Sequence, residues 1–118
     1  PLTTVTRHML GEQQFASMQE GSVLVNTARG AVIDQPALAS ALAADPPRPA
    51  FAALDVTQVE PIPTDDPLLG LPNLVLAPHI ASAGETTRRA MANLAVDNLL
   101  AGLRGERMPN CANPKVYA

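Results

Sequence analysis

The sequence predicts an α/β protein built on a parallel β-sheet. Three short apolar runs, SVLVN at 22–26, AFAALDV at 50–56 and LVLAPH at 74–79, lack the polar alternation of half-exposed strands. Segments with helical spacing or helix-capping residues separate and follow these runs. Apolar strands that alternate with helices are typical of parallel sheets covered on both faces, and we expect that arrangement here.

The first half of the chain contains two predicted helices. The segment GEQQFASMQEG at 11–21 has apolar residues at helical spacing between two glycines, which predicts a short helix. After the first strand, Asp34 is placed to cap a helix that has Pro36 in its first turn and continues through ALASALAA. The proline-rich DPPRP at 45–49 cannot continue that helix and therefore ends it.

The second and third strands are joined by a long loop, TQVEPIPTDDPLLGLPN at 57–73, which has neither strand nor helix periodicity. Loops of this length inside a compact domain are usually functional or disordered. Asp65 and Asp66 in this loop have no third ligand at suitable spacing, so we predict no metal site and expect them to form turns.

A long helix is predicted over about 84–103, followed by a loop-like tail at 104–118. Met91, Leu94 and Leu99 lie toward one face of this helix, where we expect core contacts rather than a cofactor site. This chain alone would leave part of the apolar face uncovered, so we expect the isolated chain to be marginally stable, adhesive or oligomeric.

Composition and charge exclude several classes of protein. With a net charge of −3 the chain has no electrostatic footprint for nucleic acid, and we expect no membrane segment. The single cysteine, Cys111, cannot form an internal disulfide, which fits a reducing compartment such as the cytoplasm. The opening PLTTVT has neither an initiator methionine nor a leader pattern, so we expect a segment of a longer protein.

Polar side chains with chemical potential stand where the predicted strands end. Arg29 follows the first strand, Asp55 ends the second, His79 ends the third, and Glu60 lies shortly after Asp55. Ligands of open α/β sheets bind outside the carboxyl ends of the strands, so topology alone gathers these residues at one edge. Any one of them could instead be an ordinary solvated residue, an ion-pair partner or a turn cap.

Taken together, these residue types suit one reaction. The planar guanidinium of an arginine can hold a carboxylate and polarise a neighbouring carbonyl group. A histidine exchanges a proton near neutral pH, and a carboxylate beside it favours the imidazolium. The set could therefore protonate a ketone oxygen while a hydride reaches the carbon, which describes reduction of a 2-oxo acid.

The sequence also resembles a known family over nearly its whole length. The segments FASMQEGSVLVNTARGAVIDQPAL, AALDVTQVEPIPTDDPLLGLPNLVLAPHIAS and TTRRAMANLAVDNLLAGLRGERMPN are similar to the C-terminal half of the D-isomer-specific 2-hydroxyacid dehydrogenases. Within that family, LDVT followed by EPIPTDDPLL, with NLLAGLRGE near the end, is most similar to the glyoxylate/hydroxypyruvate reductases. Many other members have phenylalanine at the position of Thr57.

The resemblance implies roles for individual residues. Arg29 matches the arginine that binds the substrate carboxylate and carbonyl, His79 matches the general acid/base, and Glu60 matches the glutamate bonded to that histidine. Positions at the nicotinamide cofactor are implied for Thr27, Ala28, Asp55 and Ala81. Gly30 would let the chain turn away from Arg29 without a Cβ clash.

The resemblance also indicates which parts of such a protein lie outside these residues. The sequence contains no G-x-G-x-x-G, nor the residue after a second strand that selects NAD or NADP, so either cofactor is possible. We assign residues 1–103 to the C-terminal part of a Rossmann-type NAD(P)-binding domain. The tail at 104–118 would return to a substrate domain that is absent from the sequence.

Three readings of function follow from the resemblance. The first is an enzyme segment for hydride transfer between a nicotinamide cofactor and a small 2-oxo or 2-hydroxy acid, reducing glyoxylate to glycolate or hydroxypyruvate to D-glycerate. The full-length enzyme is then expected to be a homodimer. The second is a non-catalytic, dinucleotide-sensing protein like the corepressor relatives. The third is a truncated product without activity, because the phosphate-binding half of the site is missing.

Overall fold

The computed structural model describes residues 1–117 and divides the chain into two compact units, Pro1–Ala81 and Ser82–Ala118. The first unit carries the sheet and every predicted site residue, and the second carries the long helix and the tail. The functional division predicted between residues 103 and 104 stays a prediction.

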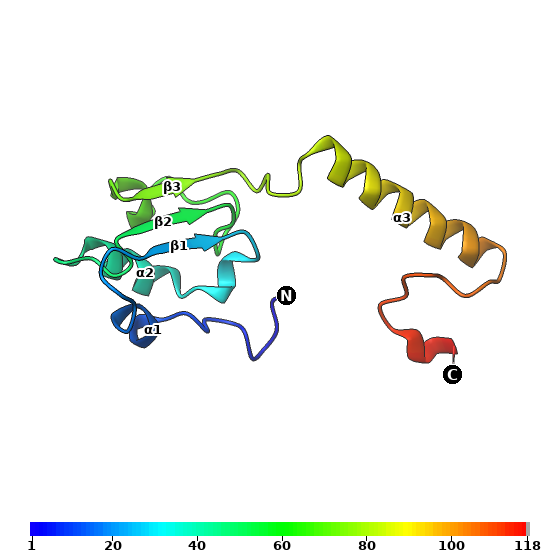
Figure 1. Cartoon of the computed structure of the whole chain (residues 1–118), viewed down its shortest axis with the longest axis horizontal. Coiled ribbons are helices and arrows are strands. Elements are labelled where there is room, and N and C mark those ends of the chain that lie inside the picture. Colours follow the sequence, from blue (N-terminus) through cyan, green and yellow to red (C-terminus); the bar gives the residue numbers. More distant parts are fainter. Residues whose placement is uncertain (118) are drawn as a thin grey trace. The chain divides into compact units, whose positions relative to one another are not determined.

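Three parallel strands form the sheet of the first unit, in the order β1-β2-β3 (Figure 1). They span Val23–Asn26, Phe51–Leu54 and Leu74–Leu76. Asn26 pairs with Leu54, and Leu54 pairs with Leu76, so the three strands end level with one another. The predicted α/β class with a parallel sheet is confirmed, and the level strand ends place the following loops at one edge.

Two helices cover one face of this sheet. α1 spans Glu12–Ala16 and α2 spans Gln35–Ala43. The Asp34 carboxylate accepts a hydrogen bond from the Ala37 backbone N–H at 3.2 Å, so the predicted cap of α2 is confirmed. The buried core comes from both helices, β2 and the loops, and consists of Phe15, Ile33, Leu38, Leu42, Ala52, Leu54 and Leu68.

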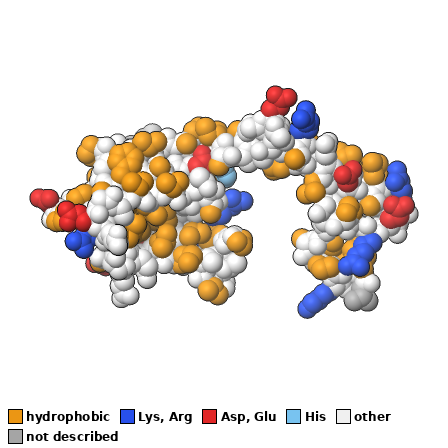
Figure 2. Space-filling model, in the orientation of Figure 1, with side chains coloured by type: hydrophobic (Ala, Val, Ile, Leu, Met, Phe, Trp, Pro, Cys, Tyr) orange, Lys and Arg blue, Asp and Glu red, His pale blue; other side chains and the backbone are white. Residues whose placement is uncertain are grey.

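The opposite face of the sheet is open within the first unit. Val25 on β1 is 63% exposed and Val75 on β3 is 53% exposed. Figure 2 shows hydrophobic side chains gathered over the part of the surface where Figure 1 draws the strands. The expectation of helices on both faces is wrong for residues 1–81, because α1 and α2 both pack on the Ala52 and Leu54 side.

The long loop between β2 and β3 is more ordered than the sequence predicts. It contains a 3₁₀ helix, η2 (Pro67–Gly70), whose Leu68 is fully buried in the core. The Asp66 carboxylate caps η2 by accepting from the Leu68 backbone N–H at 2.9 Å. The turn role predicted for Asp66 is therefore confirmed. The prediction that this loop has no helical structure is wrong.

The second unit contains the helix α3 (Glu85–Leu103), close to its predicted bounds. Met91, Leu94 and Leu99 are about half exposed or more, so the expectation that they are core residues is wrong. The tail includes a 3₁₀ turn, η3 (Pro114–Tyr117), where the sequence predicted loop. Among the described residues, no helix combines the length and apolar character needed to cross a membrane.

Adjacent leucines in η2 offer a matched test of how the long loop is anchored. Leu68 is fully buried and Leu69 is 47% exposed. We expect Leu68→Ala to lower the free energy of unfolding by roughly 2–5 kcal/mol, because it leaves a cavity in the core. Leu69→Ala should change it by less than about 0.5 kcal/mol. Denaturant unfolding followed by circular dichroism measures both, and equal effects would contradict this account of the loop.

Candidate active site

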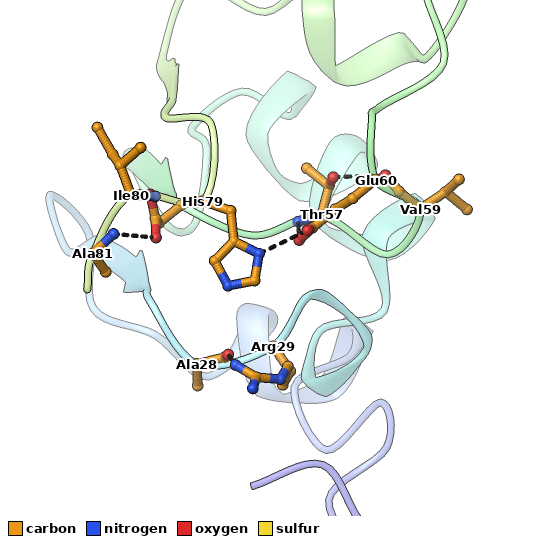
Figure 3. A network of polar contacts seen from close by, with 9 residues as sticks. Ala28, Arg29, Thr57, Val59, Glu60, His79, Ile80 and Ala81 are labelled. Carbon is orange, nitrogen blue, oxygen red and sulfur yellow. Dashed lines mark hydrogen bonds and ion pairs between the residues drawn. The ribbon is translucent and has the colours of Figure 1, made fainter. Parts of the chain in front are cut away.

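The loops that follow the three strands bring the predicted residues to one edge of the sheet. Arg29 lies three residues after β1, Asp55 directly follows β2, and His79 lies three residues after β3. Glu60 comes from the loop that begins after Asp55. Figure 3 shows the His79 imidazole directed toward Glu60, with the Arg29 side chain facing the same region from the loop after β1.

Glu60 and His79 form the central contact of this site. The Glu60 Oε2 atom lies 2.7 Å from His79 Nδ1. The second carboxylate oxygen, Oε1, accepts from the Thr57 backbone N–H at 3.1 Å. Both side chains remain partly exposed. The pair is therefore fixed on its Glu60 side and open to a ligand on its His79 side.

The electrostatics of the site keep Glu60 ionised. The hydrogen bond from His79 lowers the pKa of the Glu60 carboxyl, and the Thr57 N–H and the charges of His79 and Arg29 lower it further against a smaller opposing effect of burial. An ionised carboxylate at Nδ1 requires a proton on that nitrogen. The other ring nitrogen, Nε2, is then the one that can exchange a proton with a ligand.

Arg29 is presented by a loop that Asn26 shapes. The buried Asn26 side chain accepts from the Ala28 N–H and donates to the Arg29 carbonyl, both at 3.0 Å. The guanidinium itself is exposed, and its Nη1 donates to the Ala28 carbonyl at 2.6 Å. Its remaining donors are available to an anionic ligand. Asparagine side chains that bond the backbone two residues on form turns of this kind.

Asp55 differs from the other three because it is buried, with 7% of its surface exposed. Its carboxylate accepts from the Ile80 N–H at 2.7 Å and from the Ala81 N–H at 2.8 Å. The Ile80 hydrogen bond is the main reason that the pKa of Asp55 is lowered; burial opposes the shift, and the Ala81 hydrogen bond and the charge of His79 add to it. Asp55 therefore binds the loop that carries His79.

Gly30 allows two of these loops to touch. A Cβ atom on Gly30 would lie 1.9 Å from the carbonyl oxygen of Thr57, closer than any real contact. A Cβ clash is therefore avoided here as predicted, but the obstacle is the Thr57 backbone of the neighbouring loop, and Gly30 does not adopt the left-handed conformation that a special turn after Arg29 would need. The loop with Arg29 consequently packs directly against the loop with Glu60.

Gln35, a buried residue at the start of α2, also shapes the site, and the sequence does not predict its role. Its Oε1 accepts from the Gln58 N–H at 2.9 Å, and its Nε2 donates to the Asp66 carboxylate at 2.7 Å. Gln35 thereby holds two points of the long loop on either side of Glu60. A glutamine beside a helix cap is ordinary in sequence, so no local signal distinguishes it.

The residues predicted to contact the cofactor line neighbouring hollows. Thr27, Asp55 and Ala81 line a pocket of about 230 Å³ on the open face of the sheet, together with Val25 and Val75. Ala28 lines another pocket of about 430 Å³ with Arg29 and Thr27. His79 and Glu60 border a third, mainly apolar pocket, also of about 430 Å³ and also touching Asp55. The functional roles of all seven residues stay predictions.

Comparison with known proteins identifies the family. Residues 1–81 match the model of the NAD binding domain of the D-isomer specific 2-hydroxyacid dehydrogenases, and the chain belongs to this family. The family resemblance predicted from sequence is therefore confirmed, as is the predicted class of nicotinamide cofactor.

The relatives are much longer than this chain. It is 51% identical over 116 residues to a glyoxylate/hydroxypyruvate reductase B from Pectobacterium carotovorum, covering 98% of this chain and 36% of that protein. Among solved structures, the TT0316 protein from Thermus thermophilus is 49% identical, with a TM-score of 0.84 and coverage of 93% of this chain and 34% of that one.

A further solved relative was crystallised with a cofactor. The D-isomer specific 2-hydroxyacid dehydrogenase from Xanthobacter autotrophicus Py2, in complex with NADPH and MES, is 35% identical with a TM-score of 0.80. The match covers the whole of this chain and 47% of that one. The chain thus spans about a third to a half of these relatives.

Two glycines provide a matched test of the contact between the loops. We expect Gly30→Ala to lower the free energy of unfolding by roughly 1–3 kcal/mol, because the new methyl group forces the Thr57 backbone away. Gly70→Ala is the control, since a Cβ there meets nothing within 4 Å. Denaturant unfolding of both variants measures the difference. A Gly30→Ala protein as stable as Gly70→Ala would show that the two loops do not touch.

Proposed function

We propose that the protein carrying this chain is an NAD(P)-dependent reductase of small 2-oxo acids, which reduces glyoxylate or hydroxypyruvate. The observation that carries the proposal is the 2.7 Å contact between Glu60 and His79 at the sheet edge that also presents Arg29. Family membership supports the reaction class, and similarity to glyoxylate/hydroxypyruvate reductase B from Pectobacterium carotovorum supports the choice of substrates.

Each of the three side chains has a distinct task in this proposal. The Arg29 guanidinium binds the substrate carboxylate and polarises the adjacent carbonyl group. His79 donates a proton from Nε2 to the carbonyl oxygen as that oxygen gains negative charge. Glu60 accepts the hydrogen bond from Nδ1, which orients the ring and directs Nε2 toward the substrate. In the reverse direction, His79 removes the hydroxyl proton of a 2-hydroxy acid.

The open face of the sheet fits a nicotinamide ring. The pocket there is largely apolar, and its lining includes Val25 and Val75 as well as Thr27, Asp55 and Ala81. We propose that Thr27, Ala28 and Ala81 contact the cofactor, and that Asp55 lies beside it. When bound, the cofactor supplies the hydride. The related protein that was solved with NADPH supports NADP as well as NAD.

The setting of the protein is part of the same proposal. Cys111 is a free thiol, which supports a reducing location such as the cytoplasm. Several large apolar side chains of α3 are exposed, including Leu99 and Leu103, which supports burial against other protein surface, and we propose a homodimer. Residues 104–118 are proposed to lead toward a substrate domain.

Substitution of His79 and of Arg29 tests this function. The assays use the natural protein, including any sequence that flanks residues 1–118. We expect His79→Ala to lower kcat for glyoxylate by about 10²–10⁴-fold, because the general acid is lost. Arg29→Ala should lower kcat/KM by at least about ten- to a hundredfold, because charged hydrogen bonds to the carboxylate are lost.

His8→Ala is the matched control for these assays. His8 has the same left-handed backbone as His79, with φ of 52° against 55°, and it lies outside the site. In steady-state kinetics, kcat and kcat/KM of this variant should be close to those of the wild type. Wild-type rates in either His79→Ala or Arg29→Ala would reject the assigned roles. Dinucleotide binding without turnover of any 2-oxo acid by the wild-type protein would favour a sensing function.

A further inference from the structure

The backbone of His79 is held in an unusual conformation. Its φ of +55° lies in the left-handed region, which residues other than glycine rarely adopt. Such a conformation is strained and persists only where the surrounding structure determines it. Figure 3 shows that the chain turns at this residue and that the ring projects from the turn toward Glu60. The contacts around the turn therefore decide where the imidazole lies.

The chain is fixed on both sides of this turn, to the last residue of β2 before it and to Asp55, which follows β2, after it. Before it, the Ala77 N–H donates to the Leu54 carbonyl at 2.9 Å and continues the sheet ladder. After it, the N–H groups of Ile80 and Ala81 both donate to the Asp55 carboxylate, one to each oxygen. Asp55 is itself anchored, because its own N–H donates to the Asn26 carbonyl of β1 at 2.9 Å.

These hydrogen bonds are of a kind that a neutral side chain cannot reproduce. An ionised carboxylate accepts from backbone N–H groups with roughly twice the strength of a neutral acceptor. Asparagine at this position would turn one acceptor oxygen into an N–H₂ donor, which would face another N–H donor. The two hydrogen bonds are donated by the two residues that directly follow His79. The loss of either bond would therefore free the turn.

We propose that Asp55 is a positioning residue for His79. Its carboxylate holds the backbone after His79 so that the left-handed turn is maintained and the imidazole meets Glu60. This inference rests on the proposed function of His79 and deepens it. It is additional to the cofactor contact that family resemblance implies for Asp55, because each carboxylate oxygen accepts one backbone N–H and keeps a further lone pair.

Kinetics of the natural protein test this role. Asp55→Asn should lower kcat for glyoxylate by about 100-fold, because an ångström-scale displacement of a catalytic group costs that much. The KM for the dinucleotide should change much less than kcat, because the main loss falls on the position of His79 rather than on uniform cofactor binding. Asp65→Asn, an exposed aspartate of the same unit, is the control and should behave as wild type. A raised dinucleotide KM with kcat retained would overturn the inference in favour of a cofactor contact.

A double-mutant cycle separates positioning from general destabilisation. In a His79→Ala background, Asp55→Asn should cause little further loss of kcat, because the group that Asp55 positions is already absent. Losses that multiply would show that Asp55 acts independently of His79 and would overturn the proposal.

Hydrogen exchange in the unmutated protein gives a test that needs neither a folded variant nor turnover. Ile80 and Ala81 are exposed residues, yet their amide protons should exchange slowly because both are bonded to Asp55. Exchange at the rate of an unstructured chain would overturn the proposed clamp. Absence of 2-oxo acid turnover in the wild-type protein would instead reject the proposed function, and amide exchange would then decide the clamp alone.

Discussion

The hydrogen bond between Glu60 and His79 is the central interaction of the site, and the other features of the site hold its two residues in place. It joins residues 19 positions apart, and neither belongs to a strand or helix. The contact therefore requires that two loops be held still relative to each other. The level carboxyl ends of β2 and β3 provide the starting positions, and side-chain hydrogen bonds from Asp55 and Gln35 fix the loops that continue from them.

The same arrangement recurs in all three loops at this edge of the sheet. Each loop is tied down by a buried polar residue near a strand or helix end: Asn26 for the Arg29 loop, Asp55 for the His79 loop and Gln35 for the Glu60 loop. Their side chains satisfy backbone N–H groups that would otherwise need water. The exposed side chains of the candidate site are thus supported by buried ones, and Gly30 lets the neighbouring loops pack closely.

Much of this architecture could be predicted because it depends on local patterns. The apolar runs identified the strands, Asp34 identified the start of α2, and strand ends identified Arg29, Asp55 and His79 as neighbours. The role of Gln35 could not be read, since it depends on contacts 23 and 31 residues away. Burial of Leu68 and exposure of Val25 were also missed, because apolar character does not reveal which surfaces of a chain find a partner. The same reason explains the wrong core assignment of Met91, Leu94 and Leu99.

The pKa of the Glu60 carboxyl tests the central contact most directly. Side-chain ¹³C NMR of the natural protein, recorded as the pH is lowered, follows this group through its titration. The structure predicts a midpoint below that of an ordinary glutamate, because hydrogen bonding from His79 stabilises the carboxylate. The midpoint should move back up in His79→Ala. An ordinary midpoint that does not respond to the loss of His79 would contradict the account.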